Sequence, residues 1–372
     1  MNKPNSLYIH IPFCENLCDY CDFPKLQYFR IFAEQYLIRL KQELDSYHID
    51  HKLLTIYVGG GTPTVLDDDL LEELLKIIHP YIDGVVEYTF EANPETLNYA
   101  KLAMLKRYGV NRLSIGVEST NDDILKAINR HHTFLDVKNA VILAKQLGFD
   151  NLNVDLILGL PNATKGQLNK DLDNLLSLPI THLSCYSLSV NPHTVFFIKG
   201  IKPQDSDIER ELYDIVNERM EKEGFIHYEI SNWAKVGYES KHNYTYWKDE
   251  TYYGIGMGAS GYIDNVRYTN TKSINDYLDG VTIIEKEKIS KQDDKEYFLM
   301  LNLRTIKGID LKLYQDKFDE NLLEKKKETI EGLISKGLMI YNEKESALSL
   351  SFEGMMILDS ILMQLIEENE DN

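Results

Sequence analysis

The sequence predicts an α/β fold: a partial (β/α)6 TIM-like barrel followed by a mostly helical, winged-helix-like C-terminal module. In the first half of the chain, short apolar runs alternate with amphipathic helical patterns, and this alternation stops near residue 200. Repeated strand–helix units imply parallel strands joined by right-handed crossovers. Six such units are too few for a complete eight-stranded barrel, so a partial barrel or an open parallel sheet is expected.

The individual elements follow from the apolar pattern. Strands are expected at 7–11, 53–58, 86–91, 112–117, 152–158 and 183–188. Helices are expected at 31–47, 67–79, 96–108, 120–130, 133–147, 165–177 and 206–223. Asp67 can cap the second helix, and Gly109 and Gly148 follow later helices, where a left-handed residue is favoured. Ligands of such folds gather at the carboxyl ends of the strands, so we seek candidate residues there.

The second half of the chain has a different character. After residue 223 comes a loop-rich stretch with many aromatic residues, and residues 292–366 read as helices broken by the hairpin-like string LMIYNEKESALSLS. Helices with a small hairpin favour a winged-helix-like module. We therefore expect a core at 1–200, a barrel extension at 201–285 and a C-terminal module at 286–372.

Composition narrows the class of protein. Hydrophobic residues make up 43% and charged residues 27%, the balance of an ordinary soluble domain. The sequence has no apolar run long enough to span a bilayer, and its N-terminus lacks the features of a signal peptide, so a cytoplasmic location is expected. The net charge is −19 without a concentrated basic segment, which argues against nucleic acid as the main partner.

Three of the four cysteines lie close together in the string CENLCDYC, as Cys14, Cys18 and Cys21, and Cys185 stands alone. Closely spaced cysteines allow one loop to wrap an iron–sulfur cluster. Three ligands on a four-iron cube leave one iron open to a small molecule, so the spacing favours a [4Fe-4S] cluster. The alternative is a structural zinc site, which needs a fourth ligand such as His10 or Cys185.

Motifs along most of the chain point the same way. The pattern Cys14-x3-Cys18-x2-Cys21, with an aromatic residue before the last cysteine, resembles the radical S-adenosylmethionine (SAM) superfamily. The wider string YIHIPFCENLCDYCDF resembles oxygen-independent coproporphyrinogen III oxidases and their relatives, the HemW-type haem chaperones. The same resemblance includes GGGTPT (59–64), EANPET (91–96), GVNRLSIGVES (109–119), NVDLILGLP (153–161), HYEISNWA (227–234), HNYTYW (242–247) and LRTIKGID (303–310).

The resemblance implies a set of cofactor contacts. The three cysteines would hold the cluster, and SAM would chelate the open iron, where an electron from the cluster could cleave its sulfonium. The residues matching SAM-contact positions are Tyr8, Tyr20 (beside the adenine), Gly60, Gly61, Thr62, Glu91, Glu118, Arg130 and Asp155. From the residues alone, glycines after a strand allow a ligand to approach the backbone closely.

Two positions depart from the family pattern. Glu118 stands where the family usually has Gln, and a carboxylate can accept but not donate a hydrogen bond. Ser260 stands where many relatives have His, which we expect to remove a polar ring near the pocket.

Within the family, Phe23 favours the chaperone branch, because the oxidases typically have a fourth cysteine there. The HNxxYW motif, with His242, points to the same branch, and a neutral imidazole among aromatic rings can ligate haem iron. Such a histidine is also a common packing residue, so His242 is a candidate only. The resemblance thus implies a protein that binds haem and passes it to acceptor proteins, with a reducing electron donor as a second partner. It implies no membrane span, and membrane contact only through an acceptor.

Two alternatives stay open. One is a true coproporphyrinogen III oxidase, which uses SAM in the oxidative decarboxylation of propionate side chains during porphyrin synthesis. The other is a non-enzymatic, zinc-bound scaffold.

Overall fold

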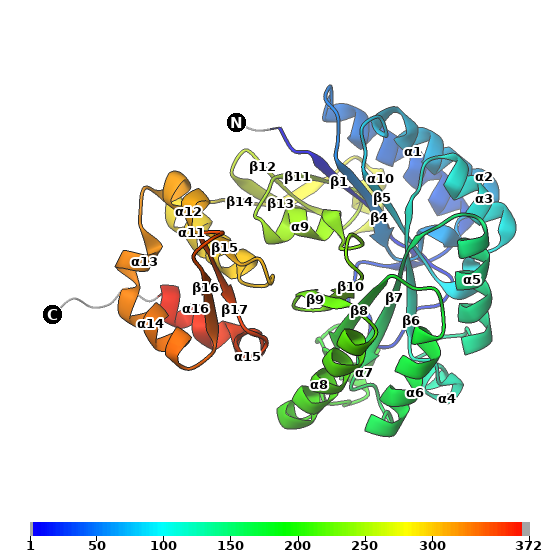
Figure 1. Ribbon diagram of the computed structural model, residues 1–372. Helices are drawn as coiled ribbons and strands as arrows, with labels where there is room; N and C mark the ends of the chain where they lie inside the picture. The colour runs from blue at the N-terminus through cyan, green and yellow to red at the C-terminus, as the bar shows by residue number, and fades with distance from the viewer. Residues whose placement is uncertain (1–2, 367–372) are drawn as a thin grey trace.

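The computed structural model describes residues 3–366 and contains the predicted α/β core (Figure 1). Six neighbouring parallel strands form it: β1 Ser6–Ile11, β4 Thr55–Gly60, β5 Glu87–Ala92, β6 Arg112–Glu118, β7 Asn151–Leu158 and β8 His182–Ser187. Helices between these strands are α1 Arg30–Ser46, α2 Asp68–Ile78, α3 Tyr99–Arg107, α4 Asp122–Ala127, α5 Phe134–Gln146 and α6 Lys165–Leu176, and α8 Ser206–Lys222 follows β8. Each lies within three residues of its predicted bounds. The prediction of a partial barrel is confirmed.

Further strands extend the sheet at both edges. On the β8 side lie β10 Asn232–Ala234 and β9 Ile226–Glu229; on the β1 side lie β11 Tyr252–Ile255, β12 Ser260–Ile263, β13 Val266–Asn270 and β14 Ile283–Lys288. The stretch after residue 223 is therefore not loop-rich, as the sequence suggested, but mostly strands. β11 pairs parallel with β1, and the pairs β11–β12, β12–β13 and β13–β14 are antiparallel. Two short helices belong to this stretch, α9 Lys241–Trp247 and α10 Ile274–Leu278.

The C-terminal module combines helices with a small sheet. Its elements are α11 Lys291–Asn302, β15 Ile309–Asp310, α12 Leu311–Phe318, α13 Leu322–Lys325, α14 Lys327–Ser335, β16 Met339–Asn342, β17 Ala347–Leu350, α15 Phe352–Met356 and α16 Leu358–Ile366. The predicted hairpin is β16–β17, and β15 joins it as a third strand. Backbone hydrogen bonds join this module to the barrel, from Ile230 N to Arg304 O (2.9 Å) and from Ile306 N to Tyr228 O (3.1 Å).

Alternation along the barrel strands separates two faces. In β1, Leu7, Ile9 and Ile11 are fully buried in the main hydrophobic core, which also contains the inward-facing residues of the surrounding helices. Tyr8 and His10, at the intervening positions, lie on the opposite face. The barrel interior is therefore polar while its outer face is apolar, and Figure 1 shows the helices along that outer face.

The predictions for residues at helix ends are confirmed for two glycines but not for the capping bond of Asp67. Gly109 and Gly148 have φ angles of +90° and +84°, as expected for residues that follow helices. Asp67 is the N-cap residue of α2, but its side chain bonds Arg30 Nη1 (2.8 Å) and makes no capping bond. Within residues 3–366, no helix has both the length and the apolar character that crossing a membrane requires.

Candidate functional site

A cavity of about 410 Å³ opens at the carboxyl ends of the barrel strands and extends into the polar interior. The predicted site residues that line it are Cys14, Cys18, Cys21, Tyr20, Gly60, Gly61, Thr62, Glu91, Glu118, Arg130 and Asp155. They come from the ends of β1 and β4 to β7 and from the loops that follow these strands. Tyr8 and His242 do not line this cavity. Most of the predicted residues are therefore brought together, although they are spread over 142 positions of the sequence, from Cys14 to Asp155.

The cysteine loop is fixed at both of its ends. Cys14 lies in β2 (Phe13–Cys14), which pairs with β3 (Leu26–Gln27), and Tyr28 N donates to Cys14 O at 2.8 Å. In the middle of the loop, Asp19 N donates to Ile128 O (3.2 Å). Burial raises the pKa of the Cys14 thiol to about 12 and also raises those of the other two cysteines in the loop. Burial therefore favours the neutral thiols over the thiolates.

The glycine loop after β4 is bonded to the cysteine loop. Gly61 N donates to Ile11 O (2.8 Å) and Thr62 N donates to Phe13 O (2.7 Å). A Cβ at Gly61 would lie 2.6 Å from Phe13 O, so only glycine allows this approach. At Gly60, where φ is +112°, a Cβ would lie 2.5 Å from the His10 ring. In this structure the glycines thus make room for protein groups, in addition to lining the cavity.

Glu91, at the end of β5, is held in a fixed orientation. Its carboxylate accepts hydrogen bonds from Tyr57 Oη (2.6 Å) and from Gly60 N (2.9 Å). A Cβ at Gly59 would lie 2.5 Å from the Glu91 carboxyl carbon, which explains the first glycine of the triplet. Burial raises the pKa of Glu91, and the Tyr57 hydrogen bond acts against this rise.

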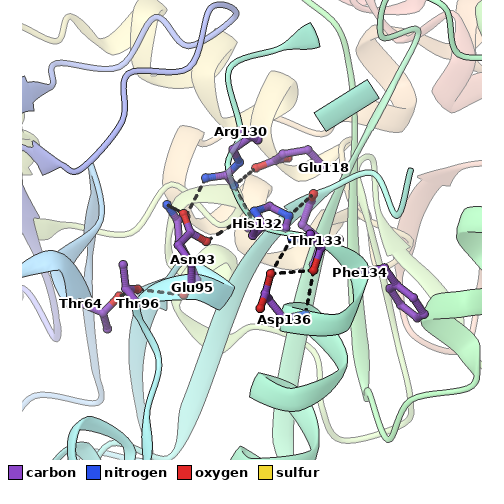
Figure 2. Close-up of polar contacts among 12 residues, drawn as sticks. Thr64, Asn93, Glu95, Thr96, Glu118, Arg130, His132, Thr133, Phe134 and Asp136 are labelled. Carbon is purple, nitrogen blue, oxygen red and sulfur yellow. Dashed lines mark hydrogen bonds and ion pairs between the residues drawn. The ribbon is translucent and has the colours of Figure 1, made fainter. Parts of the chain in front are cut away.

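Arg130 and Glu118 form a buried ion pair at 2.6 Å, with side-chain exposures of 7% and 9% (Figure 2). The guanidinium also donates to Asn93 Oδ1 (2.8 Å) and to Gly116 O (2.8 Å). Glu118 has a φ of +64°, next to a shift in the β6–β7 register, and this turns its side chain toward Arg130. A Cβ at Gly116 would lie 2.5 Å from Arg130 Nη2, so this glycine makes the contact sterically possible. The pair joins the ends of β5 and β6.

His132, two residues after Arg130, is fully buried. Its Nε2 is 3.2 Å from Val117 O, and its Nδ1 is 3.5 Å from Glu95 Oε2. The next residue, Thr133, forms a capping box with Asp136 at the start of α5 (Figure 2). These contacts of His132 and Thr133 fix the segment that directly follows Arg130.

Asp155 is a third carboxyl group on the cavity wall. Asn153 Nδ2 donates to it at 2.8 Å, and Ser114 Oγ lies at 3.5 Å. Burial raises the pKa of Asp155 to about 7, and the charges of Glu118 and Glu91 add to this rise. The buried Glu118 and the half-buried Glu91 and Asp155 surround one cavity and create a site that favours a cation or a hydroxyl-rich ligand.

Tyr20 is half-buried, and its ring centroid lies 6.5 Å from that of Phe196. Phe23, two residues after Cys21, also lines the cavity and is 63% exposed. Helix α7 (Val195–Ile198) lies against this loop, because Phe196 N donates to Asp19 O at 3.0 Å. The cavity mouth therefore has aromatic and aliphatic side chains.

Tyr8 does not line the cavity, but it contacts a residue that is hydrogen-bonded to the end of the cysteine loop. Its hydroxyl lies 2.9 Å from His10 Nδ1, and His10 Nε2 lies 2.8 Å from Pro24 O. Burial lowers the pKa of His10 to about 4, so the ring is neutral, donates to Pro24 O and accepts from Tyr8. This chain of bonds ties β1 to the far end of the cysteine loop.

His242, at the start of α9, is fully buried. Its Nδ1 lies 2.7 Å from Thr55 Oγ1, and its Nε2 lies 2.8 Å from Tyr246 Oη. Burial lowers its pKa to about 3, and the charge of Arg112 contributes to this shift. Both ring nitrogens are therefore occupied by protein groups.

Neither candidate for a fourth zinc ligand, His10 or Cys185, lines the cavity. Both nitrogens of His10 are used in the chain described above, and Cys185 is fully buried in the main hydrophobic core. Among residues 3–366, no three side chains of His, Cys, Asp or Glu are arranged around one point as a single metal ion requires. Ser260 was expected near the pocket, but this expectation is wrong, because it is exposed in β12 and does not line the cavity.

Several polar residues of the cavity were missed by the sequence analysis. They are Tyr57, Asn93, Arg112, Ser114, Asn153, Ser184, Tyr186 and Asn243. Most of them occupy alternate positions of strands that are covered by helices. Such strands are normally apolar at nearly every position, so regular polar alternation was the available signal.

Comparison with known proteins agrees with this arrangement. The model of the Radical SAM superfamily matches residues 8–175, and the model of the HemN C-terminal domain matches residues 289–357. A Lactococcus lactis protein named Heme chaperone HemW is 38% identical over 354 residues, which cover 93% of each chain. A Bacillus subtilis protein of the same name is 38% identical over 380 residues, covering 98% of this chain and 99% of the relative. The chain belongs to the HemW family of the radical SAM superfamily.

The similarity to HemW proteins covers nearly the whole chain. An Escherichia coli relative, also named Heme chaperone HemW, is 33% identical over 310 residues. The solved structure of coproporphyrinogen III oxidase from Escherichia coli has a TM-score of 0.84 at 21% identity and covers 97% of this chain, which shows a shared fold. All the predicted site residues except His242 lie in the region matched by the superfamily model.

Proposed function

We propose that this HemW-family protein is a cytoplasmic haem chaperone that binds a [4Fe-4S] cluster, SAM and haem and delivers haem to acceptor proteins. Its cluster ligands would be Cys14, Cys18 and Cys21. The observation that carries the proposal is that one cavity joins this cysteine loop to the acids Glu91, Glu118 and Asp155. The full-length similarity to proteins named Heme chaperone HemW selects the chaperone within the superfamily.

The donor set fits a multi-iron cluster better than one zinc ion. Three thiols line one cavity wall, and the described residues hold no group of donors arranged around one metal ion. A cube that binds each cysteine through a different iron needs thiols that are spread apart. Thr62 Oγ1 lies 3.8 Å from Cys14 Sγ and can donate to a cluster sulfur ligand at that corner.

The cavity chemistry also fits SAM. Glu91 and Asp155 can accept from ribose hydroxyls or an ammonium group, and Tyr20 offers a ring face for the adenine. The buried negative charge favours a sulfonium. Arg130 would hold Glu118 in place, which allows the carboxylate to replace the glutamine that is usual in the family. When bound, the cluster would supply the electron that cleaves the sulfonium.

Phe23 adds a structural argument for the chaperone over the oxidase. An exposed phenylalanine at the cavity mouth provides apolar surface where the oxidases typically have a cysteine. Phe197 and Ile198 of the adjoining α7 are also exposed, at 52% and 79%. Porphyrin faces are apolar, so this mouth suits the entry of a haem macrocycle into the cavity better than a polar surface would.

Metal analysis tests the cluster. After anaerobic purification, we expect about four irons and four sulfides per chain. Cys18→Ala should lose most of the iron, whereas Cys185→Ala, which removes a thiol outside the cavity, should retain it. About one zinc per chain without sulfide would establish the scaffold alternative instead.

Haem titration of the reconstituted protein tests the cargo. We expect a saturable Soret band and transfer of the haem to an apo-acceptor. Incubation with coproporphyrinogen III, SAM and a reductant should give no catalytic decarboxylation. Catalytic formation of protoporphyrinogen would show that the protein is an oxidase and not a chaperone.

The same titration decides the role of His242. To ligate haem, this residue would have to release Thr55 or Tyr246 and reach the ligand. A changed Soret band in His242→Ala would assign it as the ligand, and Tyr246→Phe, which frees Nε2, would then strengthen binding. An unchanged band would leave His242 a packing residue.

A further inference from the structure

Arg112 stands out in the barrel interior. It is the first residue of β6, is 2% exposed and lines the cavity on its inner side. In the sheet register it lies in one row with Tyr57 and Thr89, deeper than Glu91. Along β6 its backbone lies about 20 Å from Glu118, given a strand rise of roughly 3.3 Å per residue.

The guanidinium of Arg112 is buried without a bonded partner in the part of the chain that the structure describes. Within residues 3–366, no hydrogen bond and no ion pair involves its side chain, and its Nε is buried and unsatisfied. A buried charge of this kind is costly unless it is paired. Burial disfavours the charged form, but the nearby Glu87 and Tyr57 outweigh this and raise the pKa of Arg112.

The nearby acids are already engaged with other groups. Glu87 accepts from Lys241 N and from His242 N, both at 2.9 Å, and so caps α9. Asp155 accepts from Asn153. Arg112 thus lines the cavity without a bonded acceptor among residues 3–366.

Asn243 provides a second unpartnered donor. It lies in α9, its side chain lines the same cavity, and no hydrogen bond of that side chain occurs within the described part of the chain. Its backbone N donates to Ser240 Oγ at 3.3 Å, and the preceding His242 is fixed on both ring nitrogens. The HNYTYW motif thus anchors α9 with its histidine and presents its asparagine to the cavity.

We propose that Arg112 and Asn243 form a carboxylate-binding subsite at the inner end of the cavity, and that it takes one propionate of haem. The proposal rests on the proposed haem function. A guanidinium binds a carboxylate through two parallel hydrogen bonds, and an amide adds a third donor. SAM would bind at the open iron beside the cysteine loop, and its carboxylate would be held there. The propionates of haem carry the remaining carboxylates.

The experiment compares haem with haem dimethyl ester, whose propionates are masked. The anaerobic reconstituted protein, Arg112→Gln, Arg112→Lys and Asn243→Ala are titrated with each ligand, and their SAM affinity is measured in parallel. We expect the parent to prefer haem over the ester by roughly tenfold or more, the range of a charge-assisted pair. Arg112→Gln should abolish this preference, and Asn243→Ala should reduce it, with ester and SAM affinities unchanged.

Arg112→Lys separates this subsite from simple charge balance, because lysine keeps the charge and loses the planar fork. We expect it to reduce the preference for haem. Full preference in Arg112→Lys or in Arg112→Gln would overturn the subsite, as would a loss confined to SAM affinity. If Arg112→Gln does not fold, Asn243→Ala decides alone, because the Asn243 side chain makes no hydrogen bond with any residue from 3 to 366. A parent that binds neither ligand would overturn the proposed haem function itself.

Discussion

Removing the carboxylate of Glu118 tests whether the ion pair with Arg130 holds the wall of the cavity. In Glu118→Ala the guanidinium keeps Asn93 Oδ1 and Gly116 O but loses the carboxylate with which it forms an ion pair at 2.6 Å. Breaking a buried pair by removing one partner costs about 3 to 5 kcal/mol. Because two neutral acceptors remain, we expect the free energy of unfolding to fall by about 3 kcal/mol.

Two further variants separate charge from shape. Glu118→Gln keeps an acceptor oxygen in the same place, so its cost should be about 1 to 2 kcal/mol. The double variant Glu118→Ala/Arg130→Ala leaves no unpaired charge, so its cost should fall below the sum of the single costs by about 2 kcal/mol. The assay is urea unfolding of the cluster-free chain followed by far-UV circular dichroism.

The exposed pair of Arg30 and Asp69, 2.5 Å apart, serves as the matched control. Solvent screens that pair, so the same double-variant cycle should show little coupling there. A coupling between Glu118 and Arg130 no larger than in the control would refute the reasoning. Equal costs for Glu118→Ala and Glu118→Gln would do so as well.

Three other outcomes follow from the site. Gly61→Ala places a Cβ 2.6 Å from Phe13 O and should lower the iron bound per chain, whereas Gly332→Ala, with open space around it, should not; equal iron contents would contradict the steric argument. The pKa of Asp155 is raised to about 7, so its stabilising contribution is full below pH 4 and lost as the pH rises through 7. Asp155→Asn should therefore raise the free energy of unfolding at pH 8 by about 2 kcal/mol and have a smaller effect at pH 5, and a pH-independent effect would contradict this. Tyr57→Phe removes the bond that opposes the raised pKa of Glu91, so calorimetry at two pH values should show a smaller loss of SAM affinity at the higher pH, which favours the carboxylate. A loss of equal size at both pH values would contradict that account.

The sequence predicted the core of the fold well, because local periodicity reports burial directly. The parallel strands and the helices between them each bury one continuous apolar surface. The edge strands were missed because they are short, such as β10 Asn232–Ala234, and are stabilised by pairing with residues far away in the chain. Asp67 shows the same limit at a single residue, since a tertiary contact with Arg30 replaces its local cap.

The candidate site was predictable where residue type alone indicates chemistry. Clustered cysteines indicate metal at any position in a fold, and the resemblance supplied most of the remaining residues. Arg112 and Asn243 escaped, because only the sheet register and the place of α9 bring them to one cavity. The glycines after β4 were predicted to admit a ligand. In the structure these glycines also leave room for Glu91, for His10 and for the backbone at Phe13.

The bonds between the glycine loop and the cysteine loop have a consequence for biogenesis. A loop that is already ordered gives up little conformational entropy when metal arrives, because folding has supplied that ordering beforehand. Metal loading is then a separate event from folding, unlike in small zinc domains that fold only with their ion. Loss of the cluster would then leave the hydrophobic core of the barrel intact, so that the same chain could be loaded again.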